Sequence, residues 1–346
     1  MRKILYINLF LLFFMFSCKS EKDSPWDIND FKTIQGEAFN PDIFLGSPYD
    51  LLIANRQLFI LDEYDGKECS IVDLEKKSLI SRVLSLGEGP GEILRPIDLA
   101  FNEEEKLLEV FERSSGKLKY FLLKGDTTLI PINETIYFKG KLSRVFRLKP
   151  DIFVASGAFK EGTLSLYNQE GNVIREFGDY PIKNESRKNS MGTLFLTEQG
   201  HVAADPDGQY VASAKTNSDQ LLFYKINERN PEKIKEYFSA KAQVAVNETA
   251  NSTHIGKTEN TSFYYWDIYP TKSFLYVLYF GARAKDIDDG IVTQSYVLAF
   301  NWDGSFHKGY HIPYLLSQIA IDEIKNDLFG LTFGRTENKQ LLRFKL

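Results

Sequence analysis

The residues that could bind a ligand are scattered along this chain of 346 residues rather than gathered in one motif. The candidates are Arg95, Arg144, His201 and Trp266, because each is expected in or beside the inner strand of a repeated β unit. If they converge on one opening, they could bind an anion or a sugar through charge-assisted hydrogen bonds and ring stacking. The alternative is that the two arginines pair with neighbouring acids between units and that Trp266 packs in the core.

No catalytic or metal-binding motif is recognised, so we assign no catalytic residue, no metal and no cofactor. The four histidines form no His-Glu-x-x-His pattern, and the chain has no Gly-x-Ser-x-Gly elbow. Asp286 to Gly290 resembles part of a calcium loop, but its acids have the wrong spacing and no bidentate Glu follows at the required distance. We therefore expect a solvated hairpin tip there.

The first residues form a targeting segment. Arg2 and Lys3 precede an apolar stretch from Ile4 to Phe16, which is too short to span a bilayer, for which about 20 apolar residues are needed. The stretch ends in Ser17-Cys18, and Met15 to Cys18 resembles a bacterial lipobox, although Met15 and Phe16 depart from the strict pattern. We expect a signal peptide over residues 1–17, a lipid on Cys18 and a tether over residues 18–30. The alternative is an ordinary signal peptide whose cysteine is incidental.

The composition favours a folded protein that does not bind nucleic acid. Hydrophobic residues make up 43% of the chain, which is enough to form a core. The net charge of −5 argues against nucleic acid as a partner. Cys69 is the only cysteine besides Cys18, so we expect it to be a small buried residue without a disulfide.

The clearest unit of the fold lies between Leu51 and Glu92. A short apolar run ends at Asp65-Gly66, a pair that closes a tight hairpin because both residues tolerate positive φ. Cys69 to Leu74 is then predicted as the returning strand and Leu79 to Leu86 as an outer strand. This pattern is typical of one blade of a β-propeller.

The pattern recurs with a spacing of roughly 45 residues, which is typical of four-stranded propeller blades. We predict an all-β fold, a six-bladed β-propeller of four-stranded antiparallel blades, in a single domain over residues 31–346. Residues 240–262 interrupt the pattern and are expected to be an inserted loop, with a short strand at Gln243 to Val246. The last unit lacks a fourth strand, so Phe31 to Phe39 is expected to pair with Leu341 to Leu346 and close the ring.

Several segments together resemble a known family. They are Phe16-Ser17-Cys18, Leu58 to Asp62, Asp205-Pro206-Asp207-Gly208 and, above all, Gly87-Glu88-Gly89-Pro90-Gly91-Glu92. The chain resembles the TolB-like six-bladed propeller lipoproteins of Bacteroidetes, and the resemblance implies an outer-membrane lipoprotein on either the periplasmic or the surface face. The glycine-rich segment lacks the Gly-Lys-Ser/Thr ending of a phosphate-binding loop, so we expect a turn between blades.

These observations predict a membrane-anchored, extracytoplasmic binding or scaffolding propeller. We expect it to be a monomer that contacts the membrane through the lipid on Cys18 and binds a protein, a peptide or a glycan. The alternative is a propeller enzyme, a lyase or a hydrolase, with its site at the channel mouth. Asp126-Thr127-Thr128 resembles the Asp-Ser/Thr-x site of O-glycosylation, so Thr127 is a candidate for modification; an unmodified turn is the alternative.

Overall fold

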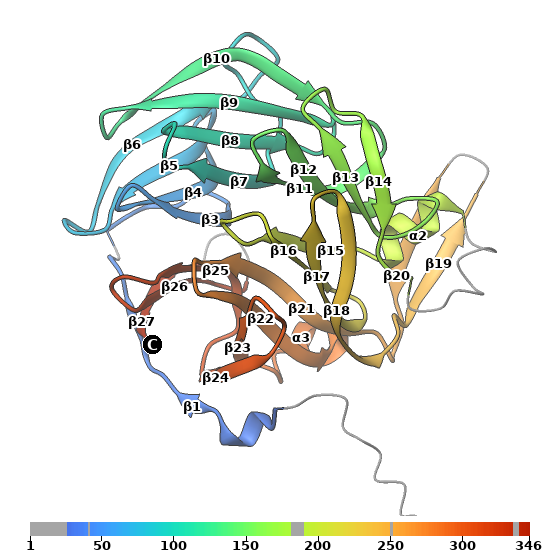
Figure 1. Cartoon of the computed structure of the whole chain (residues 1–346). Coiled ribbons are helices and arrows are strands. Elements are labelled where there is room, and N and C mark those ends of the chain that lie inside the picture. Colours follow the sequence, from blue (N-terminus) through green and yellow to red (C-terminus); the bar gives the residue numbers. More distant parts are fainter. Residues whose placement is uncertain (1–25, 41, 181–189, 250–251, 335–338) are drawn as a thin grey trace, which may run out of the picture.

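Six β-sheets are arranged around a central axis in the computed structural model, which describes residues 26–40, 42–180, 190–249, 252–334 and 339–346 (Figure 1). Each sheet is one blade, and its first strand in the chain lies nearest the axis. The six inner strands contact one another in sequence and close a ring. The predicted six-bladed propeller is confirmed.

The first three blades follow one another along the chain, each as a simple antiparallel meander. From the inner to the outer edge, their strands are β3 (Pro48–Ala54), β4 (Gln57–Tyr64), β5 (Lys67–Asp73) and β6 (Ser78–Ser85) in blade 1, β7 (Asp98–Asn102), β8 (Leu107–Glu112), β9 (Lys117–Lys124) and β10 (Thr128–Tyr137) in blade 2, and β11 (Lys141–Lys149), β12 (Ile152–Ala158), β13 (Leu164–Asn168) and β14 (Val173–Phe177) in blade 3. The Asp65-Gly66 turn has φ angles of 52° and 72°, as the sequence predicts for this hairpin.

The last three blades include the two ends of the domain. Their strands are β15 (Gly200–Ala204), β16 (Tyr210–Lys215), β17 (Asp219–Asn227) and β18 (Asn230–Ala240) in blade 4, β21 (Ser262–Pro270), β22 (Phe274–Arg283), β23 (Ser295–Asn301), β24 (Phe306–Ile312) and β1 (Lys32–Thr33) in blade 5, and β25 (Leu316–Asp322), β26 (Asp327–Thr332), β27 (Leu341–Lys345) and β2 (Gly36–Ala38) in blade 6. Blade 6 therefore takes its outer strand from the N-terminal segment.

The ring closes where β2 pairs antiparallel with β27. Gly36 lies opposite Phe344, and Ala38 lies opposite Leu342. The Phe39 N–H extends the pairing by donating to the Leu341 carbonyl at 2.9 Å, and the Phe39 ring packs edge-on against Phe329. We call this junction, with the buried side chains of Ile34 and Phe39, the seam. It confirms the predicted closure of the last blade.

The beginning of the expected closing strand follows a different path. Lys32 and Thr33 pair in parallel with Tyr310 and His311 at the outer edge of blade 5, as the fifth strand of that sheet. The Phe31 ring lies flat against Gly309, where a side chain would leave it no room. The segment thus crosses from blade 5 to blade 6, and only its second half completes the last blade.

The packed part of the chain also begins earlier than residue 31. Trp26 is only 8% exposed and packs edge-on against Tyr237 and Phe300, with ring centroids 5.2 and 5.5 Å away. A 3₁₀ helix, Ile28–Asp30, connects it to Phe31. Residues 26–30, which we expected in the tether, therefore belong to the folded part of the chain.

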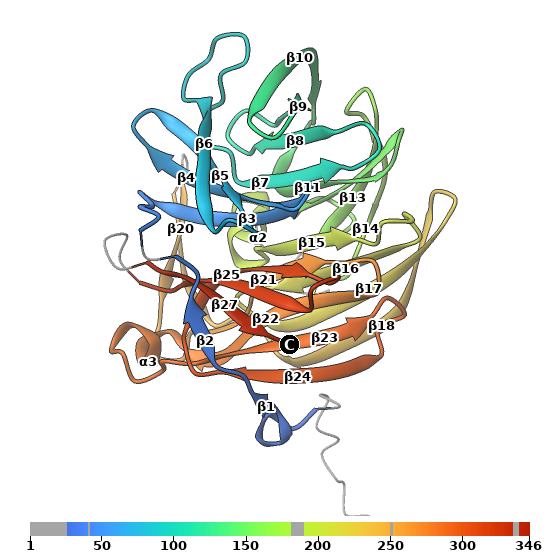
Figure 2. The ribbon, with the colours of Figure 1, turned by 90° about the vertical axis from the view of Figure 1, so that its left-hand side faces the viewer.

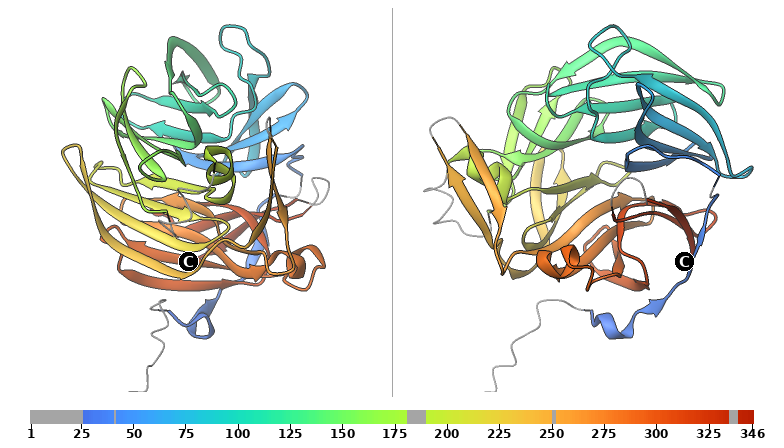
Figure 3. Two further views of the ribbon diagram at one scale, coloured as in Figure 1. Left: turned by 90° about the vertical axis from the view of Figure 1, so that its right-hand side faces the viewer. Right: turned by 180° about the vertical axis from the view of Figure 1, so that it is seen from behind.

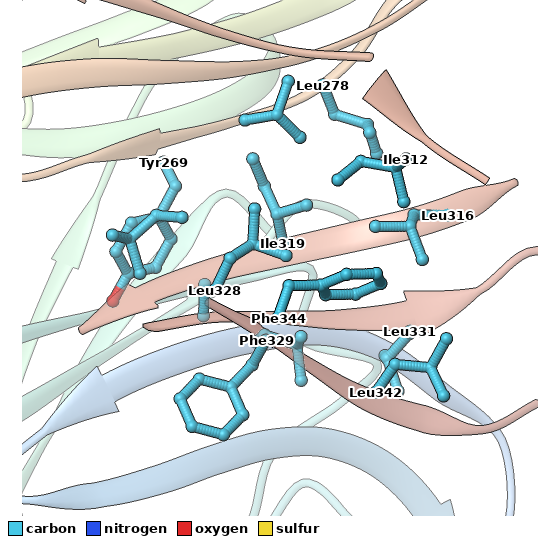
Figure 4. Packing of buried hydrophobic residues seen from close by; sticks show 14 of the residues in the cluster. Tyr269, Leu278, Ile312, Leu316, Ile319, Leu328, Phe329, Leu331, Leu342 and Phe344 are labelled. Atoms are coloured by element: carbon cyan, nitrogen blue, oxygen red, sulfur yellow. The ribbon is translucent and has the colours of Figure 1, made fainter. Parts of the chain in front are cut away.

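Neighbouring blades are held together by apolar side chains from their facing sheets. Phe59 of blade 1 stacks on Phe101 of blade 2, and Phe138 lies edge-on to Phe153 of blade 3. The largest cluster joins blades 5, 6 and 1, and Figure 4 shows Leu278 and Ile312 of blade 5 beside the side chains of blade 6. Burial of this surface is the main stabilising contribution that the sheets make to one another.

The interruption of the pattern at residues 240–262 is a separate hairpin of two strands, β19 (Val244–Glu248) and β20 (Thr253–Lys257). A short helix, α2 (Met191–Thr197), contacts it, and the Thr193 hydroxyl donates to Glu248 at 3.2 Å. A loop with one strand was expected here, whereas the structure has both strands of a hairpin. The segment from Asp286 to Gly290 lies, as expected, in the exposed connection of an antiparallel hairpin, between β22 and β23, and this connection contains a short helix, α3 (Ala284–Asp288).

The additions to the blades lie on one side of the propeller. The hairpin leads into the inner strand β21, and α3 connects the second and third strands of blade 5; in an antiparallel blade both connections lie at the end where the inner strand starts. Figures 2 and 3 show the hairpin and α3 projecting from the same side. We call this side the loop face. No helix among the described residues has the length and apolar character needed to cross a bilayer.

Candidate functional site

A cavity of about 400 Å³ opens on the loop face, between blades 1 and 2. We call it the mouth cavity, and the lining residues that carry its chemistry are Tyr49, Glu63, Glu68, Arg95, Arg113 and Ser114. Tyr49 lies at the start of the inner strand β3, while Arg113 and Ser114 form part of the turn between β8 and β9. The cavity therefore lies beside the entrance to the central channel.

The glycine-rich segment leads directly into Arg95, which lines this cavity. The Glu92 carboxylate accepts the Gly89 N–H at 2.8 Å, and the Gly87 N–H donates to the Ile93 carbonyl at 3.0 Å, so the segment folds back on itself. The Leu94 N–H is held by Glu112 at 2.9 Å. This is the turn between blades that the sequence predicts.

Arg95 itself has a strained backbone. Its φ is 43°, in the left-handed region that residues with a side chain rarely occupy, and Pro96 follows it. Such strain costs on the order of 1–3 kcal/mol and persists where the surroundings impose it, often at a ligand site. The fixed turn before it thus holds the Arg95 side chain at the cavity.

Glu68 supplies an acceptor at the cavity. Its residue is 2% exposed, and the Tyr49 hydroxyl donates to its Oε2 at 3.1 Å. Burial raises the pKa of Glu68, and the charge of Glu63 adds to this effect, while the hydrogen bond from Tyr49 and the charge of Arg95 oppose it. Burial also raises the pKa of Tyr49, so the tyrosine remains a donor.

Deeper along the inner strands lies a polar group that we call the channel cluster, made of Asp50, Asp98, Arg144, His201 and Asp267. Each comes from the inner strand of a different blade. Arg144 of blade 3 donates through Nη1 to Asp98 of blade 2 at 3.0 Å and to the Ile97 carbonyl at 2.6 Å. Because Ile97 also lines the mouth cavity, the cluster and the cavity adjoin.

The acids of the channel cluster have raised pKa values. Burial raises the pKa of Asp98 to about 6 although Arg144 opposes it, and burial raises the pKa of Asp267 to about 7 although the Ile319 N–H donates to its carboxylate at 2.9 Å. The pKa of Asp50 is also raised by burial. In the described part of the chain, one arginine compensates three buried carboxyl groups, so protonated carboxyls contribute to the cluster near neutral pH.

His201 lies within this cluster, at the second residue of β15. Its Nδ1 is 3.7 Å from Oδ1 of Asp267. Burial and the charge of Arg144 hold the pKa of His201 well below its usual range, so the ring is neutral at pH 7. The structure therefore brings together Arg144 and His201, two of the four residues that the sequence singled out, and places Arg95 at the adjoining cavity.

Trp266 lies apart from the other candidates. Its ring stacks on Phe280 at 5.1 Å and meets Phe333 edge-on at 5.3 Å, on the side of β21 that packs toward blade 6. It is partly buried in the apolar cluster of blades 5 and 6. This is the core packing that the sequence analysis kept open as the alternative, and the pairing of Arg144 with Asp98 matches the alternative for that arginine.

The remaining residues that the sequence singled out are Cys18, Thr127 and Cys69. Cys18 lies outside the described residues. Thr127 is exposed in the turn between β9 and β10, so its hydroxyl is accessible, and its modification stays a prediction. Cys69 is fully buried and unpaired, which confirms its predicted place in the core.

The sequence analysis missed two acids of the channel cluster, Asp50 and Asp98, and gave no role to the third, Asp267. Each is a charged residue inside or at the start of an otherwise apolar inner strand. That position in several repeats was a usable signal, because a buried charge needs a partner and the partner must come from another blade. Among the described residues, no group of three histidines, cysteines or acids could hold a metal ion.

A second cleft, of about 610 Å³, lies on the loop face between blades 5 and 6. Its walls are mainly apolar and include Val292, Leu315 and Phe333, and its acid Asp288 is already paired with Lys257 at 2.6 Å. It therefore offers less polar chemistry than the mouth cavity.

Comparisons with known proteins agree with this architecture. The family model for a TolB-like 6-blade propeller-like domain matches residues 27–324. A DUF4221 member from Bacteroides vulgatus has 10% identity and a TM-score of 0.53, over 91% of this chain and 97% of that one. A Bacteroides fragilis protein described as exported has 9% identity and a TM-score of 0.52, over 93% and 96% of the two chains.

A fungal propeller is equally similar in shape. The β-propeller domain of Cps50 from Myceliophthora thermophila has 12% identity and a TM-score of 0.51, over 90% of this chain and 99% of that one. Identities this low show the fold alone, because one fold hosts many functions. No curated protein is significantly similar to the chain.

Proposed function

The chain belongs to the TolB-like 6-blade propeller-like family, and from that premise we propose that it is a non-enzymatic binding propeller held at the cell envelope by a lipid on Cys18. Its ligand, part of a protein, a peptide or a glycan, enters at the loop face. The protein acts as a monomer on the periplasmic or the outer side of the outer membrane. Binding, rather than catalysis, is its primary activity.

The observation that carries the binding proposal is the mouth cavity. Its volume of about 400 Å³ falls in the range of small-ligand sites, which is about 300–1,000 Å³. Charged groups of both signs, Arg95, Arg113 and Glu68, converge on it. Ligand sites commonly combine such a concave surface with a few convergent polar groups.

Filling the cavity tests the proposal. Ser114 is exposed at its edge, so Ser114→Trp should block the opening without disturbing the core. The wild type and this variant are applied to an array of defined glycans and dipeptides. We expect at least one probe to bind the wild type and to be lost with Ser114→Trp, whereas equal binding by both proteins would place the site elsewhere.

The anchor is supported by the N-terminal sequence, in which a short apolar stretch ends at Ser17-Cys18. A structurally similar protein of Bacteroides fragilis is described as exported, which agrees with a location outside the cytoplasm. Two or more acyl chains give firm membrane attachment, where one chain is marginal. Cys18→Ala should therefore leave the protein unprocessed or soluble; recovery of the cleaved variant in the membrane fraction at the wild-type level would refute the anchor.

An enzyme is the second candidate, and the channel cluster is the observation that favours it. Asp98 and Asp267, with pKa values of about 6 and 7, could act as an acid and a base near neutral pH. We rank this function second because Asp98 is 6% exposed and Asp267 is 5% exposed, so a substrate has little access to them. Turnover of an acidic polysaccharide that is abolished by Asp267→Asn but retained by Ser114→Trp would reverse the ranking.

Thr127 is a second feature that suits an exported protein. Its turn is exposed, and the Asp126-Thr127-Thr128 sequence supports O-glycosylation there. Intact mass spectrometry of protein from its native host should show a sugar-sized loss in Thr127→Ala. Masses that differ only by the substitution would show an unmodified turn.

A further inference from the structure

Two arginines at the mouth cavity differ from nearly all others in the described chain. Arg95 and Arg113 have no hydrogen bond or ion pair, and the only other described arginine without one is Arg56, in a turn on the opposite face. The paired arginines are Arg82 with Asp62, Arg144 with Asp98, Arg147 with Glu109, Arg175 with Asn230, Arg229 with Asp151, Arg283 with Asp286 and Arg343 with Asp327.

One of the two free guanidinium groups, that of Arg113, also lies near another positive charge. Desolvation at the cavity lowers the pKa of Arg113, and the charge of Arg144 adds to this effect. Arg144 is compensated by Asp98, whereas no acid compensates Arg113. These two arginines therefore offer unused donors at the cavity, and a guanidinium can bind an anionic group through paired hydrogen bonds.

Glu68 provides a hydrogen-bond acceptor at the same cavity, beside the two arginine donors. It is nine-tenths buried or more, and its carboxylate accepts only the Tyr49 hydroxyl among the described side chains. A carboxylate can accept about four hydrogen bonds, so Glu68 has unused acceptor capacity on a surface that lines the cavity. A ligand that offers a hydroxyl or an ammonium group would use it.

We propose that the mouth cavity binds a small anion that also carries a hydrogen-bond donor, with the anionic group on Arg95 and Arg113 and the donor on Glu68. This inference rests on the proposed function and specifies its ligand. A uronic acid, which pairs a carboxylate with hydroxyl groups, and a dipeptide, which pairs a carboxylate with an ammonium group, share this chemistry. Both fit within about 400 Å³.

Calorimetric titration with five probes tests the proposal: galacturonate, galactose, dialanine, acetate and inorganic phosphate. Galacturonate, dialanine or both should bind the wild type, and galactose and acetate should bind at least tenfold more weakly. Arg113→Gln, Arg95→Gln and Glu68→Gln should each weaken binding by about tenfold or more, since loss of a charge-assisted hydrogen bond has an effect of this order. Arg56→Gln is the matched control, because it removes an equally free arginine from the opposite face, and it should leave binding unchanged.

The other outcomes separate this inference from the proposed function. Tight binding of galactose that Ser114→Trp abolishes but Arg113→Gln does not would overturn the anionic ligand and retain a binding site at the mouth. Phosphate or acetate that binds as tightly as galacturonate, with no effect of Glu68→Gln, would overturn the role of the donor. If none of the five probes binds, the ligand class proposed here is wrong, whereas array probes blocked by Ser114→Trp would still support a binding propeller.

Discussion

The seam and the mouth cavity are both places where separate parts of the chain meet, but they use their residues in opposite ways. At the seam, backbone groups of β2 and β27 pair and the side chains of Ile34 and Phe39 are buried. At the mouth cavity, Arg95 and Arg113 are exposed and have no partner among the described residues. The seam therefore uses its groups in contacts within the chain, whereas the mouth cavity leaves two guanidinium groups free.

This difference indicates that the two places have different roles. Contacts that are complete within the folded chain contribute to stability, whereas groups that the chain leaves unpaired are available to a ligand. The channel cluster is intermediate, since its side chains are buried, as at the seam, and charged, as at the mouth cavity. Changes at the three places should therefore affect stability to decreasing extents.

Removal of the seam should have the largest effect. A chain that starts at Asn40 lacks β1 and β2, so the outer edge of β27 is unpaired and the cluster around Phe329 loses Ile34 and Phe39. The lost burial and backbone pairing approach several kcal/mol, against a total stability of about 5–15 kcal/mol. We expect the melting temperature to fall by on the order of 10 °C and the protein to associate through the exposed strand, as measured by calorimetry and size-exclusion chromatography.

Two shorter truncations are the controls. A chain that starts at Trp26 keeps every described residue and should melt at the same temperature as the full-length chain. A chain that starts at Phe31 loses only Trp26 and the 3₁₀ helix, so its melting temperature should lie between the other two. If all three chains melt alike and stay monomeric, β2 does not close the ring in solution.

Disruption of the channel cluster should have the next largest effect on the free energy of unfolding. Arg144→Met removes the one described arginine beside Asp98, Asp50 and Asp267, and loss of one partner of a buried ion pair typically costs about 3–5 kcal/mol. The double variant Arg144→Met with Asp98→Asn should recover part of the loss, since it also removes the buried charge. Denaturant unfolding measures both, and a single-variant loss below about 0.5 kcal/mol would show that the pair is not needed.

The sequence predicted the seam because its signals are local. A spare strand at Phe31 to Phe39 and a missing strand after Leu341 can be read along the chain, and the turn signals placed most blade strands within a few residues. The path of Lys32 and Thr33 to blade 5 was not predictable in this way. It depends on the space that Gly309 leaves for the Phe31 ring, which only the folded sheets define.

The channel cluster and the mouth cavity were less predictable, because their residues come from different blades. Arg144 and His201 could be singled out as polar residues in inner strands, but the partner Asp98 could be identified only once blades 2 and 3 were placed side by side. Trp266 was also singled out for its place in an inner strand, but it packs against Phe280, because the side of a strand on which a residue lies depends on a bulge in β21.

Asp267 should lower the unfolding free energy by about 2–3 kcal/mol between pH 5 and pH 8. Its folded pKa of about 7 lies above the unfolded value of 3.8, so the folded state retains a proton that the unfolded state has lost between these pH values. This contribution to stability is fully present below about pH 4 and is lost as the pH rises through 7. The unfolding free energy of the wild type should therefore fall from pH 5 to pH 8, and Asp267→Asn should make that fall smaller, since Asp98 and Asp50 still contribute to it; parallel curves for both proteins would contradict the assignment.

The smallest effect on stability is expected at the mouth cavity itself. Arg113→Gln removes a charge that has no partner and that lies near Arg144, so no favourable contact is lost and a repulsion is relieved. The melting temperature should be unchanged or slightly higher, within about 0.5 kcal/mol, as for most surface substitutions. Arg113→Gln and Arg144→Met compared in the same calorimetric experiment should therefore differ by several kcal/mol, although both remove one arginine from adjoining sites. A loss of more than about 1 kcal/mol in Arg113→Gln would mean that this arginine supports the fold, and the mouth cavity would then resemble the seam rather than contrast with it.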